Sequence, residues 1–196
     1  MYMKKIIFKP ISKEERLNNR CNKYPFLITK NMSKVPFINE PEEFNNIMGK
    51  GWQNRTTPTI DEKDAQFVID FIQEELDELK EAVKEKDIVK VFDALLDITY
   101  VGLGNGALVF GLKDKIERGY AEVQASNLSK ICENLEDAEE TVRVRSLQQG
   151  TPCHYEKLGN QYVVYRTHDL KVMKSIFYKR PNLKQFFSDW EIEACK

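Results

Sequence analysis

A stretch of 22 residues in the middle of the chain, 91–112, carries only two charged side chains, Asp93 and Asp97. They are four residues apart, so on a helix they lie on one face, about one turn from each other. The stretch is long enough to cross a membrane, but two central aspartates and four glycines make it a poor span. We therefore expect a buried helix in a multi-helix or dimeric core, with a close helix approach or a local kink near the glycines.

The preceding segment, 61–86, contains neither Gly nor Pro and is predicted to be a helix. At about 100° per residue, its apolar side chains form an unusually wide arc. The arc consists of Ile69, Ile72, Leu76, Leu79 and Val83, continued by Val68, Ala82, Phe71 and Phe67. Glu75 and Glu78 fall inside this arc, so we expect both carboxylates to point towards the buried side of the helix.

Two such helices packed antiparallel would bring five carboxylates together: Glu74, Glu75, Glu78, Asp93 and Asp97. Acids without a counter-charge are not tolerated in an apolar interior, because burying an unpaired ion is costly and like charges raise one another's pKa. Lys or Arg from elsewhere is one source of positive charge. A hard divalent cation is the other, and the acids favour Mg2+, with Mn2+ as a substitute, at a site that also recruits a polyphosphate.

A di-iron site of the ferritin type is the neighbouring chemical alternative, and it needs Glu-x-x-His pairs on its helices. The only histidines, His154 and His168, lie far along the chain in the C-terminal segment. Iron chemistry is therefore disfavoured. The structural alternative is that EELDE is a plain surface string and that the aspartates are hydrogen-bonded core residues.

Signals in the rest of the chain predict where the other helices begin and end. Residues 1–40 are irregular, and we assign them no chemistry. A short helix is predicted to open at Glu40-Pro41 and to end near Gly49. Asp87 is the predicted N-cap of the second long helix, a third helix covers 113–131, and residues 133–150 are an exposed, helical candidate.

Two C-terminal segments, 161–166 and 171–178, are rich in β-branched and aromatic residues. They predict a β-hairpin that turns at 167–170.

Charge and cysteine content limit the functional classes. The chain has 196 residues with 30 basic and 31 acidic side chains of interspersed sign, which argues against binding a nucleic-acid polymer through a basic face. Its four cysteines are scattered without a CxxC pair, so we interpret them as reduced thiols of a cytoplasmic protein. The N-terminus has too few apolar residues for a signal-peptide core.

These strings together resemble the all-alpha NTP pyrophosphatase superfamily, in particular its MazG-like and phosphoribosyl-ATP pyrophosphohydrolase-like members. The resemblance covers about residues 41–180 and is carried by PEEFNNIMG at 41–49, EELDELKEA at 74–82, DALLDITYV at 93–101 and EVQASNLSK at 122–130. It implies a mainly α fold, a four-helix-type bundle with a small C-terminal β-hairpin. The implied division is an N-terminal extension (1–40), a helical core (41–132) and a C-terminal extension (133–196), assembled as a homodimer or tetramer.

The resemblance also implies the roles of the site residues. Glu74, Glu75, Glu78 and Asp97 match the family's metal-binding acids, with Glu74 and Glu75 in the catalytic role. Many members carry Glu where this chain has Ala94, so Asp93 would supply the fourth carboxylate from a neighbouring point. Asn127 and Lys130 match a string that suggests phosphate or sugar contacts.

Three further positions are substrate-binding candidates. Lys174 falls in a string related to DGKxxK, in which Leu170 replaces the glycine. Tyr100 and Trp52 are candidates for stacking on a base, or else plain core residues.

The implied activity is Mg2+-dependent hydrolysis of a nucleoside triphosphate, or a related nucleotide, to a monophosphate and pyrophosphate. Two alternatives stay open. One is a nucleotide-binding or regulatory helical module that keeps the carboxylates but has no turnover. The other is a helical assembly protein in which Asp93 and Asp97 form salt bridges between chains.

Overall fold

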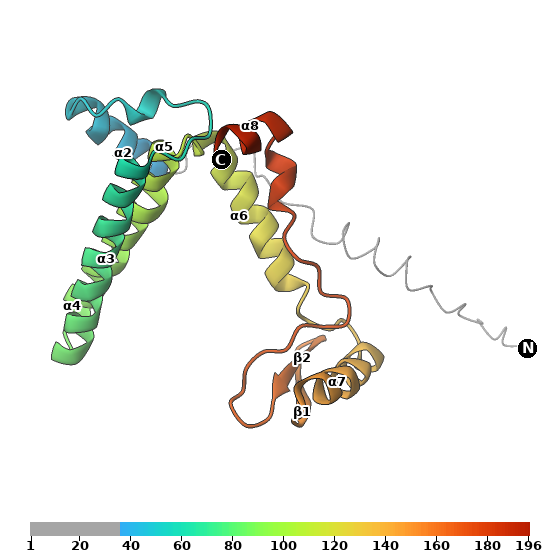
Figure 1. The fold of residues 1–196 in the computed structure, drawn as a ribbon. Helices are drawn as coiled ribbons and strands as arrows, with labels where there is room; N and C mark the ends of the chain where they lie inside the picture. Colours follow the sequence, from blue (N-terminus) through green and yellow to red (C-terminus); the bar gives the residue numbers. More distant parts are fainter. Residues whose placement is uncertain (1–35) are drawn as a thin grey trace, which may run out of the picture. The chain divides into compact units, whose positions relative to one another are not determined.

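The structure is a computed structural model that describes residues 36–196, without the side chains of 36–38 and 53. Almost all of the predicted N-terminal extension therefore lies outside the described residues. The described chain forms two compact units, residues 36–122 with 182–196 and residues 123–181, which we treat one at a time. It is mostly helical with one two-stranded antiparallel sheet near the C-terminus, which confirms the predicted fold class (Figure 1).

The first unit is built from helices. Its elements are α2 (Pro36–Ile47), η1 (Trp52–Asn54), α3 (Glu62–Glu85), α4 (Ile88–Ile98), η2 (Thr99–Asn105), α5 (Gly106–Val109) and the start of α6 (Lys113–Leu128). Asp61 caps α3 by accepting from the Asp64 amide, and Asp87 caps α4, as its position predicted. Only Lys86 and Asp87 separate α3 from α4, so the two helices lie side by side and run antiparallel (Figure 1).

Two helix boundaries differ from the sequence prediction. The helix expected to run from Asp87 to Gly111 ends at Ile98 and continues as the π-helical η2, which contains Gly102 and Gly104. This is the local distortion that the glycines predicted. Helix α2 begins at Pro36 rather than at Glu40, so Pro41 lies inside the helix and not in its first turn as predicted.

The core of this unit gathers Trp52, Val68, Leu108 and Val109. Arg55 fastens the loop before α3 by donating to the Val109 carbonyl at 2.6 Å and to the Asp64 carboxylate at 2.5 Å. The same loop passes so close to Gly111 that an added Cβ would lie 2.2 Å from the Thr57 carbonyl oxygen. Gly111 also has a φ of +63°, so no other residue fits there without displacing the loop.

The last residues of the chain belong to this unit as well. They form the short helix η3 (Leu183–Phe186) and α8 (Asp189–Ala194), the second capped by Ser188 in a capping box. Glu191 of α8 pairs with Lys115 of α6 at 2.9 Å, and Lys115 also lies over the Phe187 ring. These contacts hold the C-terminus against the first turns of α6 (Figure 1).

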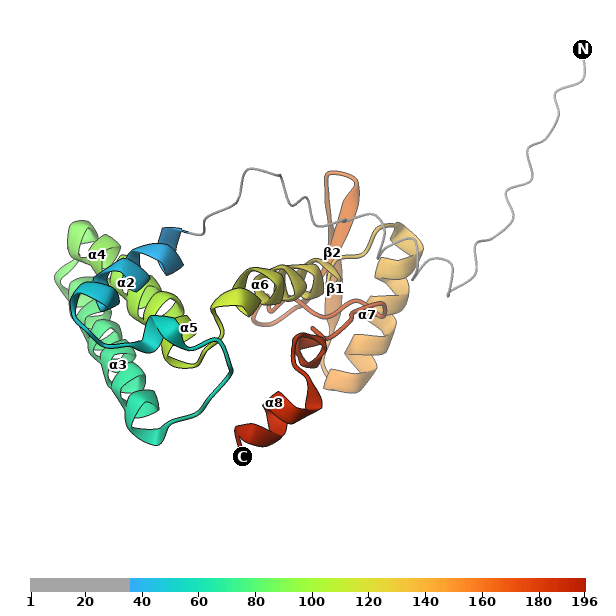
Figure 2. The same ribbon diagram turned by 90° about the horizontal axis from the view of Figure 1, so that it is seen from above.

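The second unit, residues 123–181, packs α7 (Leu135–Gln149) beside the hairpin of β1 (Cys153–Leu158) and β2 (Gln161–Arg166) (Figure 2). The strands pair from Cys153 opposite Arg166 to Leu158 opposite Gln161, around a two-residue Gly-Asn turn. Its buried cluster consists of Cys132, Ala138, Cys153, Val164 and Met173.

The predicted hairpin was therefore misplaced by one strand. The segment 171–178 meets the sheet through a single bridge, Tyr165 with Val172, whereas β1 is the main partner of β2. The Gly159-Asn160 dipeptide is the stronger turn signal, because its glycine adopts the positive φ that a two-residue hairpin requires.

Two further predictions can be followed in the structure. Cys132, Cys153 and Cys195 carry free thiols, while Cys21 lies outside the described residues. Within residues 36–196, no helix combines the length and the apolar character needed to cross a membrane.

Candidate metal and phosphate sites

The predicted carboxylates lie on the two neighbouring helices α3 and α4. Glu74, Glu75 and Glu78 stand on α3, and Asp93 and Asp97 stand on α4. The pKa of Glu75 is raised, first by burial and then by four carboxylates in decreasing order, Asp97, Glu78, Glu74 and Asp93. Asp97 of α4 therefore raises the pKa of Glu75 more than Glu74 and Glu78 of its own helix do.

This acidic cluster, as we call these five residues, has no cationic partner in the described part of the chain. The lysines of α3 and α4 pair with other acids: Lys80 with Asp77, Lys84 with Glu81 and Lys90 with Glu85. All three pairs are exposed to solvent. The charge of the acidic cluster is therefore not neutralised by any Lys or Arg among residues 36–196.

The oxygens of the acidic cluster suit a hard cation, although they do not surround a single point. Five carboxylates offer the oxygen ligands that Mg2+ prefers in proteins. Among the described side chains, no three His, Cys, Asp or Glu residues converge into a metal-ligand group. Glu74 and Glu78 are exposed, so a change of side-chain rotamer is available to bring their oxygens towards Glu75 and Asp97.

The surroundings of the acidic cluster are less buried than predicted. Val68 and Ala82 of the α3 arc are buried, but Ile69 and Val83 are 55% and 60% exposed. On α4 the exposed fractions of Phe92, Leu95 and Leu96 are 63%, 49% and 52%.

Accordingly Glu75 and Asp97 are half-buried, and Glu78 is exposed rather than buried as its place in the arc predicted. The reason is visible in Figure 1: α3 and α4 extend together beyond α2 and α5, so the part of each helix that extends has only the other helix to pack on.

The two aromatic candidates have different environments. Trp52 is a core residue: its ring lies 5.2 Å from that of Phe67, and its Nε1 donates to Asp64. It is therefore not free to stack on a base. Tyr100 is half-buried in η2, three residues after Asp97, and its pKa is raised by burial and by Glu40 of α2.

The other three substrate-binding candidates meet in the second unit. Lys130 donates to Asn127 Oδ1 at 2.8 Å, and its carbonyl accepts from the Ser175 amide. The ammonium of Lys174 lies 4.4 Å from the centre of the Tyr178 ring. Sequence reasoning did not select Tyr178, which lies between basic residues in the string KSIFYKR at 174–180.

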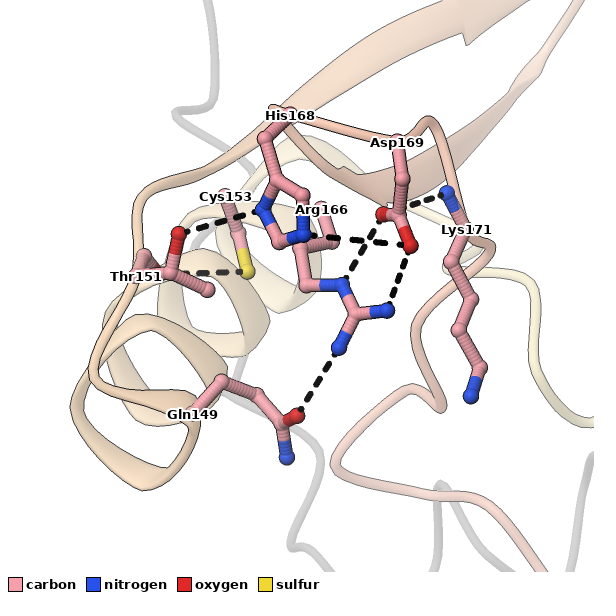
Figure 3. Close-up of polar contacts among 7 residues, drawn as sticks. All are labelled: Gln149, Thr151, Cys153, Arg166, His168, Asp169 and Lys171. Carbon is pink, nitrogen blue, oxygen red and sulfur yellow. Dashed lines mark hydrogen bonds and ion pairs between the residues drawn. The ribbon is translucent and has the colours of Figure 1, made fainter.

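The turn before Lys174 keeps its shape without the glycine that related strings carry. Leu170 adopts a φ of 56°, a left-handed conformation that suits glycine. Arg166 clamps the turn by donating to both oxygens of Asp169, which also accepts from the Lys171 amide (Figure 3). The clamp lowers the pKa of Asp169 well below its usual range, and the Lys171 side chain extends away from it.

Comparisons with known proteins agree with this arrangement in its helical part. Residues 42–127 match the family model of phosphoribosyl-ATP pyrophosphohydrolase. An uncharacterized protein of Acanthamoeba polyphaga mimivirus is 30% identical over 142 residues, which are 69% of this chain and 53% of that protein. The chain thus spans about half the length of this relative. No solved structure matches.

Proposed function

We propose that the chain is a Mg2+-dependent nucleotide pyrophosphohydrolase of the all-alpha NTP pyrophosphatase superfamily, a family supported by the match of residues 42–127 to the phosphoribosyl-ATP pyrophosphohydrolase model. The family match supports a pyrophosphohydrolase in general. The observation that carries the proposal is the acidic cluster, in which four carboxylates raise the pKa of Glu75 while no cation of the described chain neutralises them. An oxygen-only, negatively charged site of this kind favours a hard divalent cation and its phosphate ligands.

In the proposed mechanism, Glu75, Glu78 and Asp97 would hold Mg2+, and Asp93 would support them from the neighbouring turn of α4. When bound, Mg2+ polarises the phosphate oxygens and offsets the charge that develops during in-line displacement. Glu74 is exposed and orients the attacking water through a hydrogen bond from that water to its carboxylate. The proton of the water passes to the acidic cluster, without assignment to one carboxylate.

The proposed substrate is a nucleoside triphosphate or a related nucleotide, cleaved to a monophosphate and pyrophosphate. Tyr100 offers a partly buried ring for the base. Asn127, Lys130 and Lys174 offer donors for phosphate or sugar oxygens, and a lysine acts on a phosphate as a point charge.

A second copy of the chain is the partner we propose for the exposed apolar surface of α3 and α4. The side chains of Phe92, Leu95 and Leu96 form a patch on a helix whose only charges after Lys90 are Asp93 and Asp97. Contiguous apolar patches on protein surfaces mark interaction sites. A homodimer or tetramer would bury this patch and complete the surroundings of the acidic cluster.

One observation favours the alternative of a nucleotide-binding module without turnover. The five acids do not converge into a closed metal-ligand group within residues 36–196. A protein that binds nucleotides through its lysines alone would tolerate this arrangement.

Release of pyrophosphate from a panel of ribo- and deoxyribonucleoside triphosphates, with and without Mg2+, tests the proposal. We expect Mg2+-dependent release from at least one nucleotide, and a loss of roughly 100-fold or more in Glu75→Gln and Asp97→Asn. Asp77→Asn is the matched control, because Asp77 stands on the same helix but pairs with Lys80. Binding without release from any nucleotide would favour the module, and undiminished turnover by Glu75→Gln would refute the site.

A further inference from the structure

The Tyr178 hydroxyl and the ammonium groups of Lys130 and Lys174 are three hydrogen-bond donors of the second unit, near the end of α6. The pKa of Tyr178 is lowered by a hydrogen bond from Ser126 and, through their charges, by Lys174 and Lys130. No carboxylate contributes to this shift. The surroundings of the Tyr178 hydroxyl are therefore electropositive, and both lysines lie close enough to act on it.

The two lysines have no carboxylate partner in residues 36–196. Other cations of the same unit do: Arg143 pairs with Glu140, and Arg166 pairs with Asp169. Two neighbouring ammonium groups without a counter-charge repel each other, and a bound anion relieves that repulsion.

Backbone contacts fix the positions from which the lysines reach out. Arg145 donates to the Lys174 carbonyl at 2.6 Å and to the Ser175 carbonyl at 3.1 Å. Ser175 is fully buried, and its amide donates to the Lys130 carbonyl at 3.2 Å. The segments that carry Lys130 and Lys174 are thus fastened to each other, so an anion meets a preorganised pair.

The phenol adds a donor between them. Ser126 donates to the Tyr178 oxygen over 3.4 Å and to the Lys179 carbonyl at 2.8 Å. The hydrogen of the phenol turns about its C–O bond, so it is able to point towards a bound anion. A phenol with a lowered pKa is a stronger acid and therefore a better hydrogen-bond donor to an anion.

We propose that the Tyr178 hydroxyl, together with the ammonium groups of Lys130 and Lys174, binds a pyrophosphate group, as part of a nucleotide's phosphate chain or as the released product. Two ammonium groups and a phenol suit two linked phosphates better than one, because each phosphate then meets its own positive charge. The identity of the ligand rests on the proposed function, while the site itself rests on the contacts of residues 123–181.

Calorimetric titration of the full-length chain with inorganic pyrophosphate in EDTA tests this site without metal and without turnover. We expect Tyr178→Phe to weaken binding about tenfold, since a hydrogen bond to a charged group is lost. Lys174→Ala should weaken it at least as much. Tyr162→Phe is the matched control, because Tyr162 also lies beneath a lysine, Lys157, and within residues 36–196 no second cation lies over its ring.

The outcomes separate this proposal from the proposed function. Wild-type affinity in Tyr178→Phe, or no detectable pyrophosphate binding by the unaltered chain, would overturn the site. Glu75→Gln should bind pyrophosphate in EDTA as the unaltered chain does, even though we expect it to lose turnover. Titration with inorganic tripolyphosphate distinguishes the sources: tighter binding than pyrophosphate indicates the nucleotide's phosphate chain, and weaker binding indicates the product.

Discussion

The two units of the chain bury their apolar side chains in different ways. In residues 123–181, Cys132, Ala138 and Val164 are fully buried between α7, the hairpin and the segment that follows it. Along α3 and α4, by contrast, Phe92 and Leu96 are more than half exposed in the single chain. The difference teaches that the second unit builds a buried core around its hairpin, whereas the helical pair that carries the acids leaves a large apolar face uncovered, which is the surface we propose for a second copy of the chain.

The units also differ in the sign of their uncompensated charge. The acidic cluster lies on α3 and α4, and the lysines beside Tyr178 lie in the second unit. A divalent cation suits the first group, because it binds carboxylates, and a phosphate suits the second, because it binds ammonium groups.

Phe92→Glu should have the largest effect, because it places a charge in the apolar patch of α4. We expect the oligomer to dissociate to a single chain of 22.9 kDa, measured by light scattering coupled to size-exclusion chromatography. Leu147→Glu is the control, since Leu147 is an equally exposed apolar residue of α7 in the self-contained unit. If the unaltered protein is a single chain at all concentrations, the proposal that the apolar patch of α4 binds a second copy is wrong.

Gly111→Ala should destabilise the first unit by about 3 kcal/mol or more, because left-handed strain is joined by a steric clash. Gly159→Ala in the hairpin shares the positive φ but meets no atom within 4 Å, so a loss of about 1–2 kcal/mol is expected. Denaturant unfolding compares the two. Equal losses would mean that the approach of the Thr57 carbonyl is not a real constraint.

Leu170→Gly should stabilise the second unit slightly. Relief of about 1–2 kcal/mol of left-handed strain is partly offset by about 0.4–1 kcal/mol of extra chain entropy in the unfolded state. Leu158→Gly, at an exposed strand position, should instead lower stability. Thermal melting of both variants measures the difference, and a lower melting temperature for Leu170→Gly would show that the leucine side chain contributes more than the strain costs.

Glu191→Gln should have the smallest effect, and one that depends on pH. The Ser188 amide, Lys115 and the Ser188 hydroxyl lower the pKa of Glu191 from 4.5 to about 2. The folded state therefore prefers the ionised group, and this stability is present above pH 4.5 and is lost as the pH falls towards 2. The variant should melt below the unaltered protein at pH 7, and the gap should close across that window. A gap that does not change with pH would contradict the role of the carboxylate.

The sequence predicted the parts of the fold that depend on local signals. The caps Asp61 and Asp87 confirm the starts of α3 and α4, and the glycines of 91–112 confirm a distortion there. The hairpin was predicted one strand too late, because β-branched residues in 171–178 outweighed the Gly159-Asn160 turn.

Exposure and individual contacts were harder to predict. A helical wheel reports which residues share a face, but not whether a neighbour covers it, so Glu78 was predicted to be buried and is exposed. Asp97 lies close enough to raise the pKa of Glu75, whereas the metal-binding role of these acids stays a prediction. The place of Tyr178 beside Lys130 depends on a contact between segments more than 40 residues apart, which no local pattern reveals.

The most direct test of the central claim is the melting temperature of the full-length chain in EDTA and in excess Mg2+, compared with that of Glu75→Gln. We expect Mg2+ to raise the melting temperature of the unaltered chain and to leave that of the variant nearly unchanged. In EDTA at pH 7 the variant should melt at the higher temperature, because it removes one charge from an uncompensated cluster. An unaltered chain whose melting temperature is the same with Mg2+ and with EDTA would contradict the claim that these acids bind a cation.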